Sequence, residues 1–171
     1  MLPFIDLSAQ QDRIAEEIKT RVESVFAHGK YILGPEVDRL EKALEKYASV
    51  KNAVTCANGT DALSLALMAW NIGPNDAVFL PSFSYISTAE APAQLGAVPF
   101  FVDVKKDTYN MCPDNLQSCI KKAESKSLKP SVVVPVDLFG QPAEITEIEK
   151  ISREYGMKTL IDSAQSFGAS I

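Results

Sequence analysis

The sequence has few of the residues from which metal sites and disulfide frameworks are built. Its three cysteines, Cys56, Cys112 and Cys119, give an odd count without CxxC spacing. This count argues against a disulfide framework and a structural zinc site, and it favours a reducing cytoplasm. His28 is the only histidine, so any His-cluster metal site or Ser-His-Asp arrangement would have to be built around it. A surface or capping role is favoured for it, and we expect no metal site.

The sequence also has no excess of basic residues and no long hydrophobic run. The formal net charge is −5 at pH 7, which argues against duplex nucleic acid as a partner. A small phosphorylated ligand stays compatible with this charge, because backbone N–H groups can hold a phosphate. The longest apolar-rich run, residues 62–70, is too short to span a bilayer, and residues 1–13 lack the basic start of a signal peptide. We therefore expect a cytoplasmic protein that binds neither nucleic acid nor membrane.

The first 50 residues have the pattern of helices. Apolar side chains recur at helical spacing over residues 8–28, and Gly29 is a plausible helix end. A second apolar stripe, residues 37–47, follows Pro35, which suits a first helical turn. Residues 1–50 are thus predicted to be a helical N-terminal segment.

From residue 51 onward, short apolar runs alternate with amphipathic segments. This alternation predicts βαβ units and an α/β fold, with a mostly parallel sheet flanked by helices. The runs VVVPV (132–136) and FFVDV (100–104) are continuously hydrophobic, as expected of strands covered on both faces. The predicted strands are 53–57, 77–81, 98–104, 131–136 and 157–161, and the predicted helices are 61–71, 86–95, 113–124 and 144–155.

Ligands of open α/β sheets bind outside the carboxyl ends of the strands, so the residues after each run are candidates. Asn58-Gly59-Thr60 follows the first run and opens a helix, where backbone N–H groups and the helix dipole favour a phosphate. Alternatively, Asn58 or Thr60 caps its own helix. Neither a GxxxxGK[ST] loop nor a GxGxxG fingerprint is present.

Two further candidates follow later strands. Tyr85 could offer a stacking face for a flat ring, or it could be a packed core aromatic. Asp162 directly follows an apolar strand, where a partly desolvated carboxylate needs a partner. A cationic ring nitrogen would satisfy it, as would a helix cap or a structural ion pair. Each signal is weak alone, but all three lie on one predicted edge of the sheet.

Eight segments spread over the chain carry a more specific signal. They are FIDL (4–7), GKYILGPEV (29–37), CANGTDAL (56–63), PSFSYISTAE (81–90), LGAVPFFVDV (95–104), DTYN (107–110), VPVDLFGQPA (134–143) and IDSAQSFGAS (161–170). Together they resemble the DegT-type aminotransferases of fold type I, which use pyridoxal 5′-phosphate and act on nucleotide-linked keto sugars. The wording is most similar to the subgroup that aminates UDP-2-acetamido-2-deoxy-3-oxo-glucuronate.

This resemblance implies a role for each candidate. The chain would be the N-terminal part of the large pyridoxal-phosphate-binding domain, with residues 51–171 forming its sheet region. Tyr31 could reach toward the sugar or a partner subunit. The implied cofactor contacts are Gly59, Thr60 and the Asp61 backbone to the phosphate, Tyr85 against the pyridine ring, Asp162 on the ring nitrogen and Gln165 near the phenolic oxygen.

The family's Schiff-base lysine lies in sequence beyond the DSAQ motif, and hence beyond Ile171. Lys158 starts a strand, at the wrong edge of the sheet, while Lys105 and Lys106 lead into a polar turn. We therefore expect that these 171 residues, without the C-terminal part and the small domain, contain no catalytic residue and have no transaminase activity by themselves.

The resemblance also implies glutamate as amino donor, a homodimer, and a place in surface polysaccharide, lipopolysaccharide or glycan synthesis. Two alternatives fall within the same family: a sugar dehydratase with the lysine replaced, and a non-catalytic regulator that retains the cofactor pocket. A nucleotide-binding oxidoreductase is disfavoured because the glycine fingerprint is missing.

Overall fold

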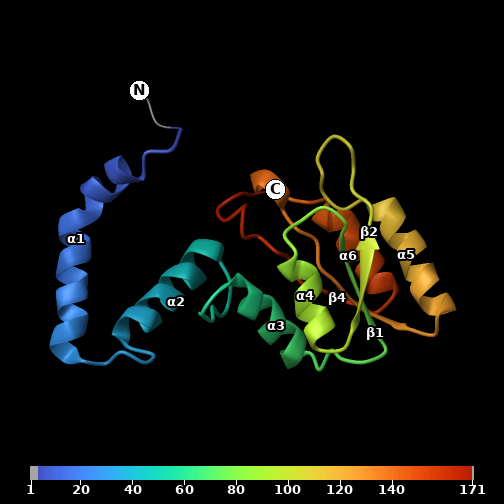
Figure 1. The fold of residues 1–171 in the computed structure, drawn as a ribbon, viewed down its shortest axis with the longest axis horizontal. Helices are drawn as coiled ribbons and strands as arrows, with labels where there is room; N and C mark the ends of the chain where they lie inside the picture. The colour runs from blue at the N-terminus through green and yellow to red at the C-terminus, as the bar shows by residue number, and fades with distance from the viewer. Residues whose placement is uncertain (1–3, 171) are drawn as a thin grey trace. The chain divides into compact units, whose positions relative to one another are not determined.

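The computed structural model describes residues 4–170, which divide after Thr55 into two compact units. The first unit contains helices α1 (Leu7–His28) and α2 (Pro35–Ala48) (Figure 1). Gly29 ends α1 in a left-handed conformation, φ 65°, and its N–H donates to the Val25 carbonyl at 3.0 Å. Pro35 occupies the first turn of α2. The predicted helices and both of these boundary signals are confirmed.

The apolar stripes of these two helices are exposed in the structure. No residue of α1 or α2 is buried, and Phe26 is 69% exposed. His28 has the predicted capping role, because its Nδ1 accepts the Lys30 N–H at 3.0 Å and its Nε2 lies 3.2 Å from Glu36 Oε2. Among residues 4–170, no helix combines the length and the apolar character needed to cross a membrane.

The second unit is a parallel sheet flanked by helices, which confirms the predicted fold class. Its four strands lie in the order β2-β1-β3-β4, and every pairing between them is parallel. The elements are α3 (Gly59–Ala69), β1 (Asp76–Pro81), α4 (Ser87–Gln94), β2 (Val98–Val102), α5 (Pro113–Ser125), β3 (Lys129–Val133), η1 (Leu138–Gly140), α6 (Ile145–Glu154) and β4 (Lys158–Thr159).

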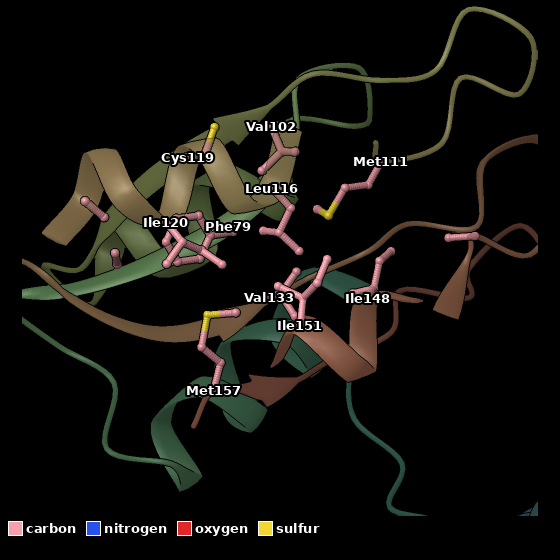
Figure 2. Close-up of a cluster of buried hydrophobic side chains, with 13 residues drawn as sticks. Phe79, Val102, Met111, Leu116, Cys119, Ile120, Val133, Ile148, Ile151 and Met157 are labelled. Carbon is pink, nitrogen blue, oxygen red and sulfur yellow. The ribbon is translucent and has the colours of Figure 1, made fainter. Parts of the chain in front are cut away.

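Each face of the sheet has its own core, because alternate residues of a strand point to opposite faces. Ala77 and Phe79 of β1 pack with side chains of α5 and α6, among them Leu116, Ile120 and Ile148 (Figure 2). Val78 and Leu80 belong to a separate cluster with Leu63 and Leu67 of α3 and Ala89 of α4. Both faces of β1 are therefore dry, as its continuous apolar run requires. The expectation that residues 100–104 are covered on both faces is wrong, because β2 lies at the edge of the sheet and Phe101 is 55% exposed.

The prediction of a strand at 53–57 is wrong. This stretch is not part of the sheet, and its polar groups bond to side chains of α2 instead. The N–H and the hydroxyl of Thr55 both donate to Glu41 Oε1, at 2.8 and 2.9 Å, and the Ala53 N–H donates to Glu45 Oε1 at 3.2 Å. The β-branched composition gave the right local tendency, but a strand also needs a neighbouring strand, and the described residues contain none for it.

Leu67 and Leu65 lie on opposite sides of burial in the same helix, so substituting each of them compares the buried face of α3 with its exposed face. Leu67 is 1% exposed, whereas Leu65 is 50% exposed. Leu67→Ala should lower the free energy of unfolding by about 2–5 kcal/mol, because it leaves a cavity between α3 and the sheet. Leu65→Ala should change it by less than about 1 kcal/mol. Urea unfolding monitored by circular dichroism measures both, and equal losses would contradict this placement of α3.

Candidate functional site

A cavity of about 310 Å³ opens at the carboxyl edge of the sheet, within the second unit. This volume is near the lower end of the range for small-molecule sites, about 300–1,000 Å³. The structure brings five of the six predicted cofactor residues to its wall: Gly59, Thr60, Tyr85, Asp162 and Gln165. The sixth, Asp61, lines a separate hollow on the outer side of α3.

Asn58 organises the turn that leads into α3. Its Oδ1 accepts the Asp61 N–H at 2.9 Å, its Nδ2 donates to Asp61 Oδ2 at 3.0 Å, and its carbonyl accepts the Ala62 N–H at 3.1 Å. The capping interpretation of Asn58 is thus confirmed. The N–H groups of Gly59 and Thr60 lie in the first helical turn, where no intrahelical acceptor exists. They are therefore the groups at this helix end that can hold an anion.

Gly59 leaves open space in the cavity wall. Its φ is not positive, and a Cβ built there would have no protein atom within 4 Å. The backbone conformation and the packing of the protein therefore do not require glycine at this position. The small residue keeps room at a helix N-terminus, where a phosphate would need it.

Tyr85 is 74% exposed, so the alternative of a packed core aromatic is wrong. It lies between the end of β1 and the start of α4, and its ring is free to cover a flat ligand. Ser84 and Ser87, which were not predicted individually, line the cavity beside it. Their signal was the group of hydroxyl residues between a strand and a helix.

Asp162 is half-buried at the cavity wall and is fixed by its backbone. It forms a parallel bridge with Val136, and its N–H donates to the Pro135 carbonyl at 2.9 Å. Its Oδ1 accepts the Ala164 N–H at 3.2 Å. Within residues 4–170 no Lys, Arg or His forms an ion pair with it, so the structural ion pair is wrong here. The remaining lone pairs can accept a hydrogen bond from a cationic ring nitrogen.

Gln165 is held by the loop that follows β3. Its Oε1 accepts the Phe139 N–H at 2.6 Å. This bond leaves the Nε2 group of Gln165 to donate to an oxygen in the cavity. The side chain can therefore approach a phenolic oxygen, as the resemblance implies.

None of the lysines considered in the sequence lines this cavity. Lys105 is paired with Glu144, and the hydrogen bond to that carboxylate, followed by its charge, raises the pKa of the Lys105 amine. A raised pKa keeps the amine protonated and therefore poorly nucleophilic. Lys158 lies over the Trp70 ring, 5.2 Å from its centroid.

Tyr31 lies in the first unit, in the turn between α1 and α2. This turn, 29–35, borders an open hollow of about 600 Å³, and the Tyr31 side chain is 66% exposed. Its suggested contact with a sugar or a partner subunit stays a prediction.

The donor set of the cavity fits pyridoxal 5′-phosphate: free N–H groups with open space for a phosphate, an exposed aromatic ring, and a carboxylate with unused acceptors. The sequence model of the DegT/DnrJ/EryC1/StrS aminotransferase family matches residues 12–171. The chain belongs to this family. The resemblance seen in the sequence is thereby confirmed.

Two curated relatives illustrate the range of the likeness. UDP-2-acetamido-2-deoxy-3-oxo-D-glucuronate aminotransferase of Pseudomonas aeruginosa is 44% identical over 99% of this chain and 46% of its own length. A pleiotropic regulatory protein of Geobacillus stearothermophilus is 33% identical over 98% of this chain and 44% of its own length. The chain thus spans about half the length of the curated relatives it matches.

Solved structures of similar proteins agree with this fold. A DegT/DnrJ/EryC1/StrS aminotransferase from Brucella abortus superposes with a TM-score of 0.94 at 45% identity, covering 97% of this chain and 45% of the other. NtdA from Bacillus subtilis, with bound cofactor PMP, superposes with a TM-score of 0.89 at 27% identity, covering 99% and 38%. The expected cofactor of the family, pyridoxal phosphate with its amino form PMP, is therefore confirmed.

Asn58 offers a direct test of how the α3 N-terminus is built. Asn58→Ala removes the acceptor for the Asp61 N–H and should lower the free energy of unfolding by about 1 kcal/mol. Asn58→Ser keeps a capping oxygen, so its free energy of unfolding should stay within about a few tenths of a kcal/mol of the parent value. Chemical denaturation of both variants measures these free energies of unfolding. A serine variant as unstable as the alanine variant would contradict the capping role.

Proposed function

We propose that this chain supplies the cofactor site of a pyridoxal-phosphate-dependent aminotransferase that acts on a nucleotide-linked keto sugar. The observation that carries the proposal is the single cavity in which the α3 N-terminus, Tyr85, Asp162 and Gln165 meet. Taken alone, none of these features specifies a ligand. A phosphate cradle, a stacking ring and a free carboxylate together match one ligand, a phosphorylated pyridine.

The residues divide the work of holding this ligand. The N–H groups of Gly59 and Thr60 bind the phosphate, with the helix dipole favouring its negative charge. Tyr85 covers one face of the ring, and Gln165 orients it through the phenolic oxygen. Asp162 holds a proton on the ring nitrogen. The bound cofactor supplies an electron sink for the substrate carbon, and this sink works best with that nitrogen protonated.

For the substrate we propose a UDP-2-acetamido-2-deoxy-3-oxo-glucuronate type of sugar, with glutamate as amino donor. The name of the Pseudomonas aeruginosa relative, 44% identical over nearly the whole chain, supports this choice. The complete protein would act as a cytoplasmic homodimer in surface polysaccharide or glycan synthesis. The lysine that carries the cofactor, on this proposal, belongs to a part of the protein outside these 171 residues.

A second candidate is a non-catalytic regulator that binds the cofactor. It is favoured by the name of the Geobacillus stearothermophilus relative, a pleiotropic regulatory protein. Both candidates require the same cavity, so cofactor binding supports either one. Turnover of a keto sugar distinguishes them.

Asp162→Asn tests the cofactor site in the full-length gene product. PMP is the suitable probe, because it binds without a lysine linkage. The amide cannot stabilise a protonated ring nitrogen as a carboxylate does, so PMP should bind about 10–100-fold more weakly, the equivalent of about 1.5–3 kcal/mol. Equilibrium titration followed by cofactor absorbance measures the dissociation constant.

Asp103→Asn is the matched control. Asp103 also lies at the carboxyl edge of the sheet, just after β2, but it is not part of the cavity wall. This variant should bind PMP as the parent does. Equal affinity of the parent and Asp162→Asn would remove the role assigned to Asp162.

The substrate is tested by single turnover. The full-length protein loaded with PMP should convert UDP-2-acetamido-2-deoxy-3-oxo-glucuronate to its 3-amino product, and glutamate should regenerate PMP. A dTDP-linked keto sugar lacking the carboxylate serves as the comparison and should react at least about ten-fold more slowly, since lost polar contacts cost specificity. PMP binding without turnover of either sugar would favour the regulator.

A further inference from the structure

Asp137 is the one charged side chain that is buried among residues 4–170, with 5% of its surface exposed. Its Oδ1 accepts the Ala143 N–H at 2.8 Å. Its Oδ2 accepts the hydroxyls of Ser166 and Ser163, at 2.8 and 3.2 Å. Burial of a carboxylate is costly unless it is fully hydrogen-bonded, and here three donors satisfy it.

These bonds fasten both ends of one turn. Ser163 and Ser166 border the two residues between them, Ala164 and Gln165, and the Ser166 N–H closes the turn onto the Ser163 carbonyl at 3.1 Å. The Ala164 N–H donates to Asp162 Oδ1, and Gln165 lines the cavity. Asp137 thus fixes the turn from which two predicted cofactor contacts project.

The loop of Asp137 is held independently on its other side. Asn110, 3% exposed, accepts the Leu138 N–H through Oδ1 at 3.1 Å and donates from Nδ2 to the Gln141 carbonyl at 2.9 Å. The backbone N–H of Asp137 also donates to the Asp162 carbonyl at 3.0 Å. Asp137 therefore projects from an anchored segment, and a rigid support is what a positioning group needs.

We propose that Asp137 is a positioning residue: its buried carboxylate, through Ser163 and Ser166, holds the carboxylate of Asp162 toward the ring nitrogen of the cofactor. The inference rests on the proposed function of the cavity. Asp137 does not line the cavity and acts only through the turn.

The test compares PMP with its 1-deaza analogue, in which the ring nitrogen is replaced by C–H. The ratio of their two dissociation constants reports the contact of Asp162 with the nitrogen and cancels general effects on folding. The full-length parent should prefer PMP by about ten-fold or more, as for a charge-assisted hydrogen bond, and Asp162→Asn should abolish the preference.

Ser166→Ala removes the hydroxyl that donates the shorter of the two hydrogen bonds to Asp137. It should lower the preference for PMP at least about three-fold, as should Asp137→Leu. Asp137→Asn should retain most of it, because the amide keeps Oδ1 for Ala143 while the hydroxyls rotate to accept from Nδ2. Ser152→Ala is the matched control: this buried serine hydroxyl bonds to the Met157 carbonyl at 3.1 Å, before β4 begins, and its loss should leave the preference unchanged.

A second readout needs no cofactor. Hydrogen exchange at the Ala164 and Ser166 amides should accelerate about ten-fold in Ser166→Ala and Asp137→Leu and stay at the parent rate in Ser152→Ala. Unchanged exchange and an unchanged PMP preference in Ser166→Ala would overturn the positioning role. If the parent itself showed no preference for PMP over the 1-deaza analogue, the cofactor site would be overturned instead. The exchange rates would still decide whether Asp137 holds the turn.

Discussion

Parallel pairing of β1, β3 and β4 is the constraint on which the site depends. β1 is in register with β3, and β3 with β4, through Phe79↔Val133 and Val133↔Thr159. The bridge between Val136 and Asp162 extends this register beyond the last strand. All carboxyl ends of a parallel sheet meet at one edge, so segments far apart along the chain, such as those of Tyr85 and Asp162, come together there.

That edge combines a rigid base with exposed contact groups. Asn58 caps α3, while Asn110 and Asp137 hold the loop after β3 through buried hydrogen bonds. The exposed Tyr85 ring and the half-buried Asp162 line the cavity at this edge. Buried polar groups that are fully bonded specify one loop geometry, and exposed groups that lack partners are the ones a ligand can use.

Many details of the fold could be predicted because they depend on local chemistry. Gly29 ends α1 through its left-handed conformation, and Pro35 opens α2 because its missing N–H is not needed there. The stretch at 53–57 shows the limit of such reasoning. Its β-branched residues indicate an extended chain, but pairing depends on a neighbour elsewhere, and Glu41 and Glu45 take its hydrogen bonds instead.

The sequence by itself determined the family, the alternation of strands and helices, and five residues of the cavity wall, because periodicity and motifs are local properties of the chain. Only the tertiary structure decided the strand order β2-β1-β3-β4 and the burial of Asp137 beneath the Asp162 turn. Each of these depends on which groups meet across space. A residue type does not say whether its hydrogen bonds go to a ligand, to a cap or to a distant loop.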